Sequence, residues 1–186
     1  MSKSARNLVI GLGAMLVVAA SPRVAIGRDT NASGDALVNA RVGVRVRTSS
    51  PTVSALIHQA AARSTTFHGV IAEIGNTDGI VYVEPGKCPH GVRACLLMEM
   101  AISGSNRLLY VLVDTKRADT ELMAAIAHEL RHAVEVLSNR SLKTGTAMYF
   151  FYRLTGTSLG RGAFETAAAI ETGQAVRTQL RSSPSR

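Results

Sequence analysis

The chain has 186 residues, a formal net charge of +8 and no tryptophan, and hydrophobic residues make up 46% of it. This is enough chain for one ordinary domain with a real hydrophobic core. The basic residues are spread out rather than interleaved with aromatic residues, and no nucleic-acid-binding motif is present, so we expect no nucleic-acid partner. We find no internal repeat and no low-complexity linker, which favours a single domain.

The N-terminus has the pattern of a secretory signal peptide. Lys3 and Arg6 precede an uncharged apolar run at 8–20, and small residues follow up to Gly27. The run is shorter than the stretch of about 20 residues that spans a bilayer. We therefore predict a signal peptide at 1–27 and export to the periplasm or the cell exterior, with an uncleaved anchor as the alternative. No later stretch reaches this length, so no stable membrane span is expected after cleavage.

After a polar lead-in, strand-like and helical patterns follow each other along the chain. Apolar residues at every second position predict a strand over 40–47, and Ser50-Pro51 is typical of a helix start. Apolar residues at helical spacing predict helices at 51–64 and 67–74. Strand-like runs lie at 80–84, 94–102 and 107–114. Because the loops between these runs are short, we expect an antiparallel meander.

Cys88 and Cys95 are the only cysteines. In an exported chain, a pair this close in sequence is most simply a disulfide that closes a short loop. The alternative is a set of metal ligands formed by the two cysteines and His90, but such a loop lacks the paired C-x-x-C spacing of structural zinc sites.

The clearest helical pattern covers 120–137 and contains the H-E-x-x-H sequence His128-Glu129-Leu130-Arg131-His132. The run has no Gly or Pro, and Asp119 or Thr120 can cap its start. On a helix, His128 and His132 lie about 40° apart around the axis and about 6 Å apart along it, so both can bind one cation. Glu129 lies about 100° further round and can reach a water on that cation.

This spacing is the one in which zinc lowers the pKa of a bound water to about 7 while a carboxylate accepts its proton. We therefore predict a zinc ion bound by His128 and His132. The alternative is a surface helix with two solvated histidines.

The third zinc ligand has three candidates downstream. An aromatic segment at 147–154 is followed by a helical pattern at 163–180, in which Gly173 makes an unbroken helix less certain. On that helix Glu165 shares a face with apolar residues, so its carboxylate turns inward and a metal is a good partner for it. Glu171 points to the polar margin and is expected to be solvated. Glu135 is too far from His128 along its helix, which favours a contact with a ligand histidine or with Arg131.

The motif helix and the later segment Phe164-Glu165-Thr166-Ala167-Ala168 resemble the zincin metallopeptidases, specifically the gluzincin branch. The resemblance covers about 105–180 and implies His128, His132 and Glu165 as zinc ligands, Glu129 as catalytic base, and the strand at 108–113 as the edge along which an extended substrate lies. It implies a small, mostly antiparallel α+β fold in which a C-terminal helix carries the third ligand. The chain is also similar to small exported bacterial proteins of unassigned function that carry an H-E-x-x-H helix.

Two positions differ from the related patterns. Glu135 and Ser138 stand where the metzincins have Gly and a third His, which disfavours that branch. Ala169 stands four residues after Glu165, where many gluzincins have an acidic residue that orients a ligand histidine.

The expected function is that of an exported zinc-dependent metallopeptidase acting on peptides or proteins, with residues 28–181 as its domain and 182–186 as a flexible tail. One alternative is a zinc-binding domain that does not cleave its partner but recognises an envelope protein or a cell-wall component. Another is a structural domain held by the disulfide, in which the motif occurs by chance. Candidate donors to the oxyanion are Tyr149, Tyr152, Arg161 and His90, and none is assigned.

Overall fold

The computed structural model describes residues 45–160 and 162–182, which belong to one compact unit. The predicted signal peptide 1–27, most of the predicted strand 40–47 and most of the predicted tail lie outside the described residues. Helices and small sheets make up the described part, which confirms the predicted α+β class.

Two consecutive helices come first among the helices of the described chain. They are α2 (Pro51–Arg63) and α3 (Thr65–Gly75), and they follow the short strand β1 (Val46–Arg47). Ser50 caps α2 by accepting a hydrogen bond from Val53 N–H, and Pro51 occupies the first turn. Ser64 ends α2 and caps α3 by accepting from Phe67 N–H at 3.0 Å. The sequence patterns at 51–64 and 67–74 therefore correspond to two helices that share one serine as their boundary.

The main sheet is mixed. Besides β1 it contains β2 (Gly79–Pro85), β3 (Ala94–Leu96), β4 (Ala101–Ser103) and β5 (Asn106–Val113). Its order is β1-β2-β5-β3, and β4 also pairs with β5. β5 runs parallel to β2, with Ile80 opposite Leu108, and antiparallel to β3 and β4. The predicted antiparallel meander is therefore wrong in its strand order.

The physical reason lies in the segment between Pro85 and Ala94. Neighbouring strands are about 4.8 Å apart, so two strands with a third between them are about 10 Å apart. A few extended residues are long enough to connect them. The predicted strand 94–102 is divided into β3 and β4, and the turn at Gly104, which has a φ of 57°, leads into β5. β5 then fills the position between β2 and β3, and two chain reversals leave it parallel to β2.

The second half of the chain supplies the motif helix and a hairpin. It consists of α4 (Thr120–Ser138), α5 (Gly145–Thr155), β6 (Thr157–Gly160), β7 (Ala163–Glu165) and α6 (Ala167–Ser182). The predicted helix 163–180 is thus wrong at its start, and Glu165 lies on a strand. Gly160 and Gly162 have φ values of 86° and 79°, which suit the hairpin, and Thr166 caps α6 by accepting from Ala169 N–H at 3.2 Å.

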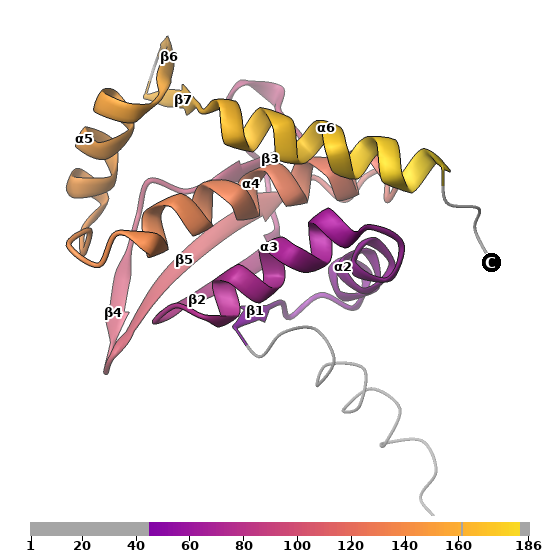
Figure 1. Ribbon diagram of the computed structural model, residues 1–186, viewed down its shortest axis with the longest axis horizontal. Helices are drawn as coiled ribbons and strands as arrows, with labels where there is room; N and C mark the ends of the chain where they lie inside the picture. Colours follow the sequence, from indigo (N-terminus) through magenta and orange to yellow (C-terminus); the bar gives the residue numbers. More distant parts are fainter. Residues whose placement is uncertain (1–44, 161, 183–186) are drawn as a thin grey trace, which may run out of the picture. The chain divides into compact units, whose positions relative to one another are not determined.

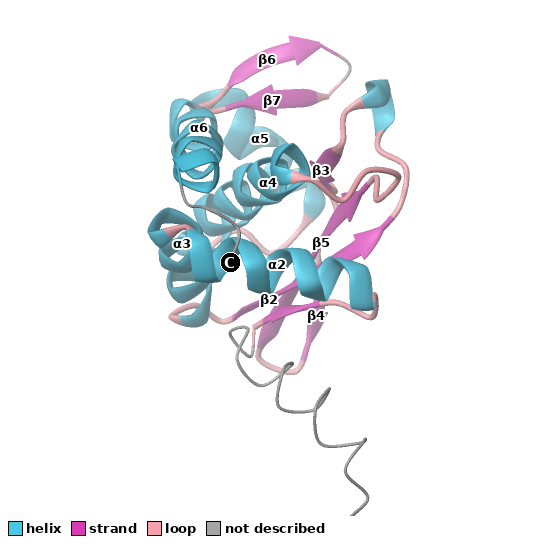
Figure 2. Cartoon of the chain, turned by 90° about the vertical axis from the view of Figure 1, so that its right-hand side faces the viewer, coloured by secondary structure: helices cyan, strands magenta, loops and turns pink. Residues whose placement is uncertain are grey.

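Helix α4 lies at the centre of the fold. It packs against β3 and β5 on one side and against α6 on another, as Figures 1 and 2 show. Leu122, Ile126, Leu130 and Leu137 on α4 are at most 1% exposed. Gly173 lies within an unbroken α6, and a Cβ there would be 3.4 Å from His128 Cβ, so the glycine allows α6 to pass close to the motif.

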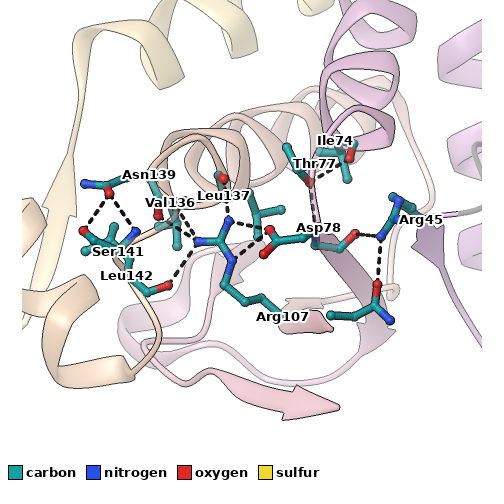
Figure 3. A network of polar contacts seen from close by, with 12 residues as sticks. Arg45, Ile74, Thr77, Asp78, Arg107, Val136, Leu137, Asn139, Ser141 and Leu142 are labelled. Atoms are coloured by element: carbon teal, nitrogen blue, oxygen red, sulfur yellow. Dashed lines mark hydrogen bonds and ion pairs between the residues drawn. The ribbon is translucent and has the colours of Figure 1, made fainter. Parts of the chain in front are cut away.

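A buried arginine holds the C-terminal end of α4 (Figure 3). Arg107, at the start of β5, is 2% exposed. Its guanidinium donates to the backbone carbonyls of Val136, Leu137, Asn139 and Leu142, and to the Asp78 carboxylate. The last carbonyls of a helix lack their usual partner within the helix. Arg107 supplies a donor to Leu137 and Leu142, and a second donor to Val136 and Asn139, which also accept from the N–H groups of Asn139 and Leu142.

Candidate metal centre

Helix α4 brings the two motif histidines together in its middle. The rings of His128 and His132 have centroids 4.9 Å apart and meet edge to face. The His132 side chain is 7% exposed and that of His128 is 20% exposed. Asp119 caps the helix through Leu122 N–H, at 2.9 Å, as one of the two predicted caps. The histidines therefore share one stripe of the helix, with one ring buried and the other reaching solvent.

Glu165 joins the histidines from β7. Its Oε1 lies 2.9 Å from His128 Nε2 and 3.2 Å from His132 Nε2. Two donors, each about 2.1 Å from a tetrahedral ion, are about 3.4 Å apart, so these separations are close to those of a metal site. One ligand atom from each residue lies within 4.8 Å of the others, and the three side chains could hold a metal ion.

The other two candidates for the third ligand lie elsewhere. Glu171 is exposed on α6, where a solvated residue was expected. Glu135 lies on the far side of His132, where its Oε2 is 3.1 Å from Nδ1. Because a carboxylate only accepts, the ring nitrogen is the donor. Arg131 instead pairs with Glu73 of α3 at 2.8 Å. Of the two partners considered for Glu135, His132 is therefore the one that forms the hydrogen bond.

Glu135 supplies the carboxylate that Ala169 lacks. Ligand histidines usually give their second N–H to a carboxylate or carbonyl, which sets the tautomer and the ring orientation. Here the carboxylate comes from α4 itself, and Thr166 donates to its Oε1 at 2.6 Å. Ala169 is buried and apolar. The orienting group therefore comes from a position that the related pattern does not mark.

The charges of this cluster shift the pKa values of its members. Burial lowers the pKa of His132, but the hydrogen bonds of Glu135 and Glu165 outweigh it and raise that pKa to about 9. Burial raises the pKa of Glu165, but the hydrogen bonds and charges of His132 and His128 outweigh it, so the pKa is lowered. The pKa of Glu135 is lowered in the same way, through His132 and Thr166. The carboxylates thus favour a positive charge at the position where their oxygens meet the imidazole nitrogens.

Glu129 lies beside the cluster and is not one of the three residues that could hold a metal ion. Its Oε1 is 4.0 Å from His128 Nε2, and its Oε2 accepts a hydrogen bond from Leu96 N–H at 2.7 Å. The side chain is 13% exposed, and burial raises its pKa against the opposing effects of His132, His128 and the Leu96 N–H. A raised pKa makes this carboxylate a stronger proton acceptor than an exposed glutamate. The Leu96 contact has no signature in the motif, because it depends on how β3 meets α4.

These residues line a pocket of about 220 Å³. Leu96 and Met98 form one wall, and Phe164 and Leu159 of the hairpin form another. Tyr152 also reaches the pocket, but its hydroxyl donates to the carbonyl of His132 at 2.8 Å. Burial raises the pKa of Tyr152 further above its usual value. Tyr152 therefore anchors the motif helix and is not placed as an oxyanion donor.

The other three donor candidates receive no support from the described structure. The Tyr149 ring packs edge to face against Phe150 and Phe164, with centroids 5.6 and 5.4 Å apart. Arg161 and the side chain of His90 lie outside the described residues.

The sheet edge nearest the cluster is β3. The strand expected from the resemblance, 108–113, forms most of β5, which pairs on both sides and so offers no free edge. That expectation is therefore wrong. Beside Leu96 on β3, the predicted disulfide is present and joins Cys95 to Cys88, with Cα atoms 5.8 Å apart. The bond closes the loop before β3 and links this edge strand to the segment that precedes it.

Comparison with profiles of known protein families, with curated proteins and with solved structures gives no match. Among the described residues, no helix has the length and apolar character needed to cross a membrane.

Proposed function

We propose that this chain is an exported, zinc-dependent peptidase of the zincin type. The observation that carries the proposal is the convergence of Glu165 on both motif histidines, with the Glu129 carboxylate beside them. Two imidazoles and one carboxylate are the ligand set of many catalytic zinc sites, which leave one position for water. The disulfide favours export, because such bonds persist in oxidising compartments.

When bound, zinc polarises a carbonyl and lowers the pKa of its water. The residues of the chain do the remaining work. His128, His132 and Glu165 hold the ion, and Glu135 keeps the His132 ring in the orientation that presents Nε2. Glu129 takes a proton from the attacking water and passes it to the leaving amine. Its hydrogen bond to Leu96 N–H holds one carboxylate oxygen in place while the other faces His128.

The alternative is a zinc-binding domain that recognises an envelope protein or a cell-wall component without cleaving it. Both functions need the three ligands, but only the peptidase needs Glu129 as a base. The hydrogen bond from Leu96 N–H gives Glu129 a structural contact that such a binding domain would also use. A glutamine at position 129 separates the two, because its carbonyl oxygen still accepts from Leu96 while it no longer takes up a proton.

The test combines metal content with activity. We expect about one zinc per chain by elemental analysis, lost in His132→Ala and in Glu165→Ala, and retained in Glu171→Ala as the matched control. Glu129→Gln should keep the zinc and lose hydrolysis of a peptide mixture by about a hundredfold or more. Hydrolysis that persists in Glu129→Gln would contradict the peptidase mechanism. A chain that takes up no zinc after reconstitution would contradict the metal site itself.

A further inference from the structure

A second, larger pocket opens beside the metal centre. Its volume is about 570 Å³, within the range of about 300 to 1,000 Å³ found for ligand pockets. The two pockets share wall residues, including Val92, Leu96, Met98 and Leu159, so they are neighbours. A group held in the larger pocket therefore lies next to the ion that the cluster could hold.

The wall of this pocket is apolar. The described residues that line it are Pro, Val, Cys, Leu, Met, Gly and Ala, and none of these described residues carries a charge. One side belongs to the loop closed by the Cys88–Cys95 disulfide and to β3, and the other belongs to the β6–β7 hairpin. Val92 and Leu159, from these two sides, are 51% and 66% exposed. Large apolar side chains left open to water beside a functional site are typical of surfaces that contact a ligand.

A third pocket beside the site differs in character. It has a volume of about 280 Å³, adjoins His128 and Glu129 and is lined partly by Arg93 and Arg177. Each of these arginines has an acidic partner, Asp119 at 2.6 Å and Glu121 at 2.7 Å. Their charges are thus largely balanced. The described wall of the larger pocket is apolar, whereas the third pocket is polar with its charges paired, so the larger pocket offers the stronger basis for selecting a substrate.

We propose that the larger pocket binds a bulky apolar side chain, aromatic or long aliphatic, of an extended peptide next to the bond that is cleaved. This inference rests on the proposed peptidase function and names its substrate class. Leu96 connects the pocket to the reaction, because its backbone N–H donates to Glu129 and the residue lines both pockets. The same hairpin carries Leu159 in the pocket and Glu165 in the metal cluster, so a peptide seated there contacts the element that supplies the third ligand.

The experiment measures binding separately from cleavage. The probes are short labelled peptides of Ala and Gly in which a single Phe, or a single Asp, is placed at each position in turn. Affinities are measured by fluorescence anisotropy on the zinc-loaded full chain carrying Glu129→Gln, so the probe is not consumed. We expect Phe at one position to tighten binding by about tenfold or more over Ala, as burial of an aromatic side chain predicts, and Asp there to weaken it.

Two surface substitutions provide the specific test and its control. Leu159→Asp places a charge on the wall of the pocket and should abolish the preference for Phe. Leu154→Asp changes an even more exposed leucine, at 88%, on α5 and outside the pocket wall, and should leave the preference unchanged. Both positions are on the surface, so neither substitution disturbs the core.

The outcomes separate this inference from the function on which it rests. Equal binding of the Phe, Ala and Asp peptides by a zinc-loaded chain overturns the pocket and leaves the metal site standing. An equal loss of preference in both leucine variants overturns it as well. A fatty acid that binds more tightly than any peptide, and that Leu159→Asp releases, overturns it in favour of a lipid site. If the preference for Phe holds and depends on Leu159 while the wild type cleaves nothing, the pocket is established and the peptidase function fails.

Discussion

Two polar clusters lie along α4, and they differ in whether they are complete. At the C-terminal end, Arg107 gives its donors to four backbone carbonyls and to Asp78, so its charge and its donors are satisfied within the chain. In the middle, Glu129, Glu135 and Glu165 surround His128 and His132. This second cluster brings three carboxylates to two imidazoles.

Whether the charged groups of a cluster are paired within the chain indicates what the cluster does. A buried cation with every donor paired needs nothing more and stabilises the end of the helix. A cluster with more carboxylates than partners holds protons or attracts a metal cation, and the raised pKa of His132 reflects this excess of negative charge. The Arg107 cluster therefore stabilises the fold, whereas the histidine cluster could hold a metal ion.

Among the substitutions that test this difference, we expect Arg107→Met to have the largest effect, a loss of stability. The substitution keeps an apolar stem but removes the guanidinium donors to the Leu137 and Leu142 carbonyls, and one of the two donors to each of Val136 and Asn139. Asp78 is 36% exposed and can be hydrated, so the cost comes mainly from the carbonyls. We expect a loss of about 3 to 5 kcal/mol in the free energy of unfolding, measured by urea denaturation of the metal-free chain.

Arg181→Met is the matched control for that measurement. It removes an ion pair with Glu121 in which the arginine is 67% exposed, and such pairs contribute about 0 to 1 kcal/mol. Equal losses in the two variants would remove the distinction between the buried cluster and an ordinary surface pair.

The second prediction concerns pH. Without metal, the pKa of His132 is raised from 6.5 to about 9, so its contribution to stability is fully present below pH 6.5 and is lost as the pH rises through 9. A metal ion must displace this proton from Nε2. We therefore expect zinc affinity to rise by about tenfold per pH unit up to about pH 9, or about a hundredfold from pH 7 to pH 9.

Calorimetric titration with zinc at several pH values, in buffers of different ionisation enthalpy, measures both the affinity and the protons released. Despite burial, the pKa values of the Glu135 and Glu165 carboxylates are lowered by their contacts with His132, so neither carboxylate releases a proton in this window. An affinity that is flat from pH 7 to pH 9 would show that His132 is not protonated in the metal-free cluster.

The smallest effect is expected from Glu135→Gln. Glutamine keeps the shape of the side chain and can still accept from His132 Nδ1, but it loses the charge that strengthens this hydrogen bond. Loss of an orienting partner typically weakens metal binding by about 10- to 100-fold, and the amide should lie at the lower end of that range. Competition with a zinc-binding dye measures the change.

Thr166→Val also tests the effect of Glu135 on metal binding, because it removes only the hydroxyl that donates to the Glu135 carboxylate. We expect a smaller loss of affinity than in Glu135→Gln. A larger loss would indicate that Thr166 acts mainly by capping α6, where its hydroxyl also accepts from Ala169 N–H. Circular dichroism of the variant would then show reduced helicity.

Features set by neighbouring residues could be predicted from the sequence alone. The helix at 120–137 differs from α4 by one residue at its end, and one of the two proposed caps, Asp119, is the one used. The spacing of His128 and His132 follows from helix geometry, and the disulfide was predicted from two cysteines that lie close together in the sequence. In each case a few adjacent residues contain the whole interaction.

The tertiary structure alone decided the contacts between distant segments. Glu165 was expected on a helix but reaches the histidines from β7, because glycines favour the hairpin and Thr166 starts α6 after it. The sheet edge nearest the histidine cluster is β3 and not 108–113. The loop after Pro85 leads to β3 and leaves the position next to β2 for β5. The contact of Leu96 N–H with Glu129 and the capping of α4 by Arg107 likewise depend on which strands pack against the helix. Local patterns encode dihedral preferences and one-turn spacing, whereas these pairings depend on the packing of the whole core.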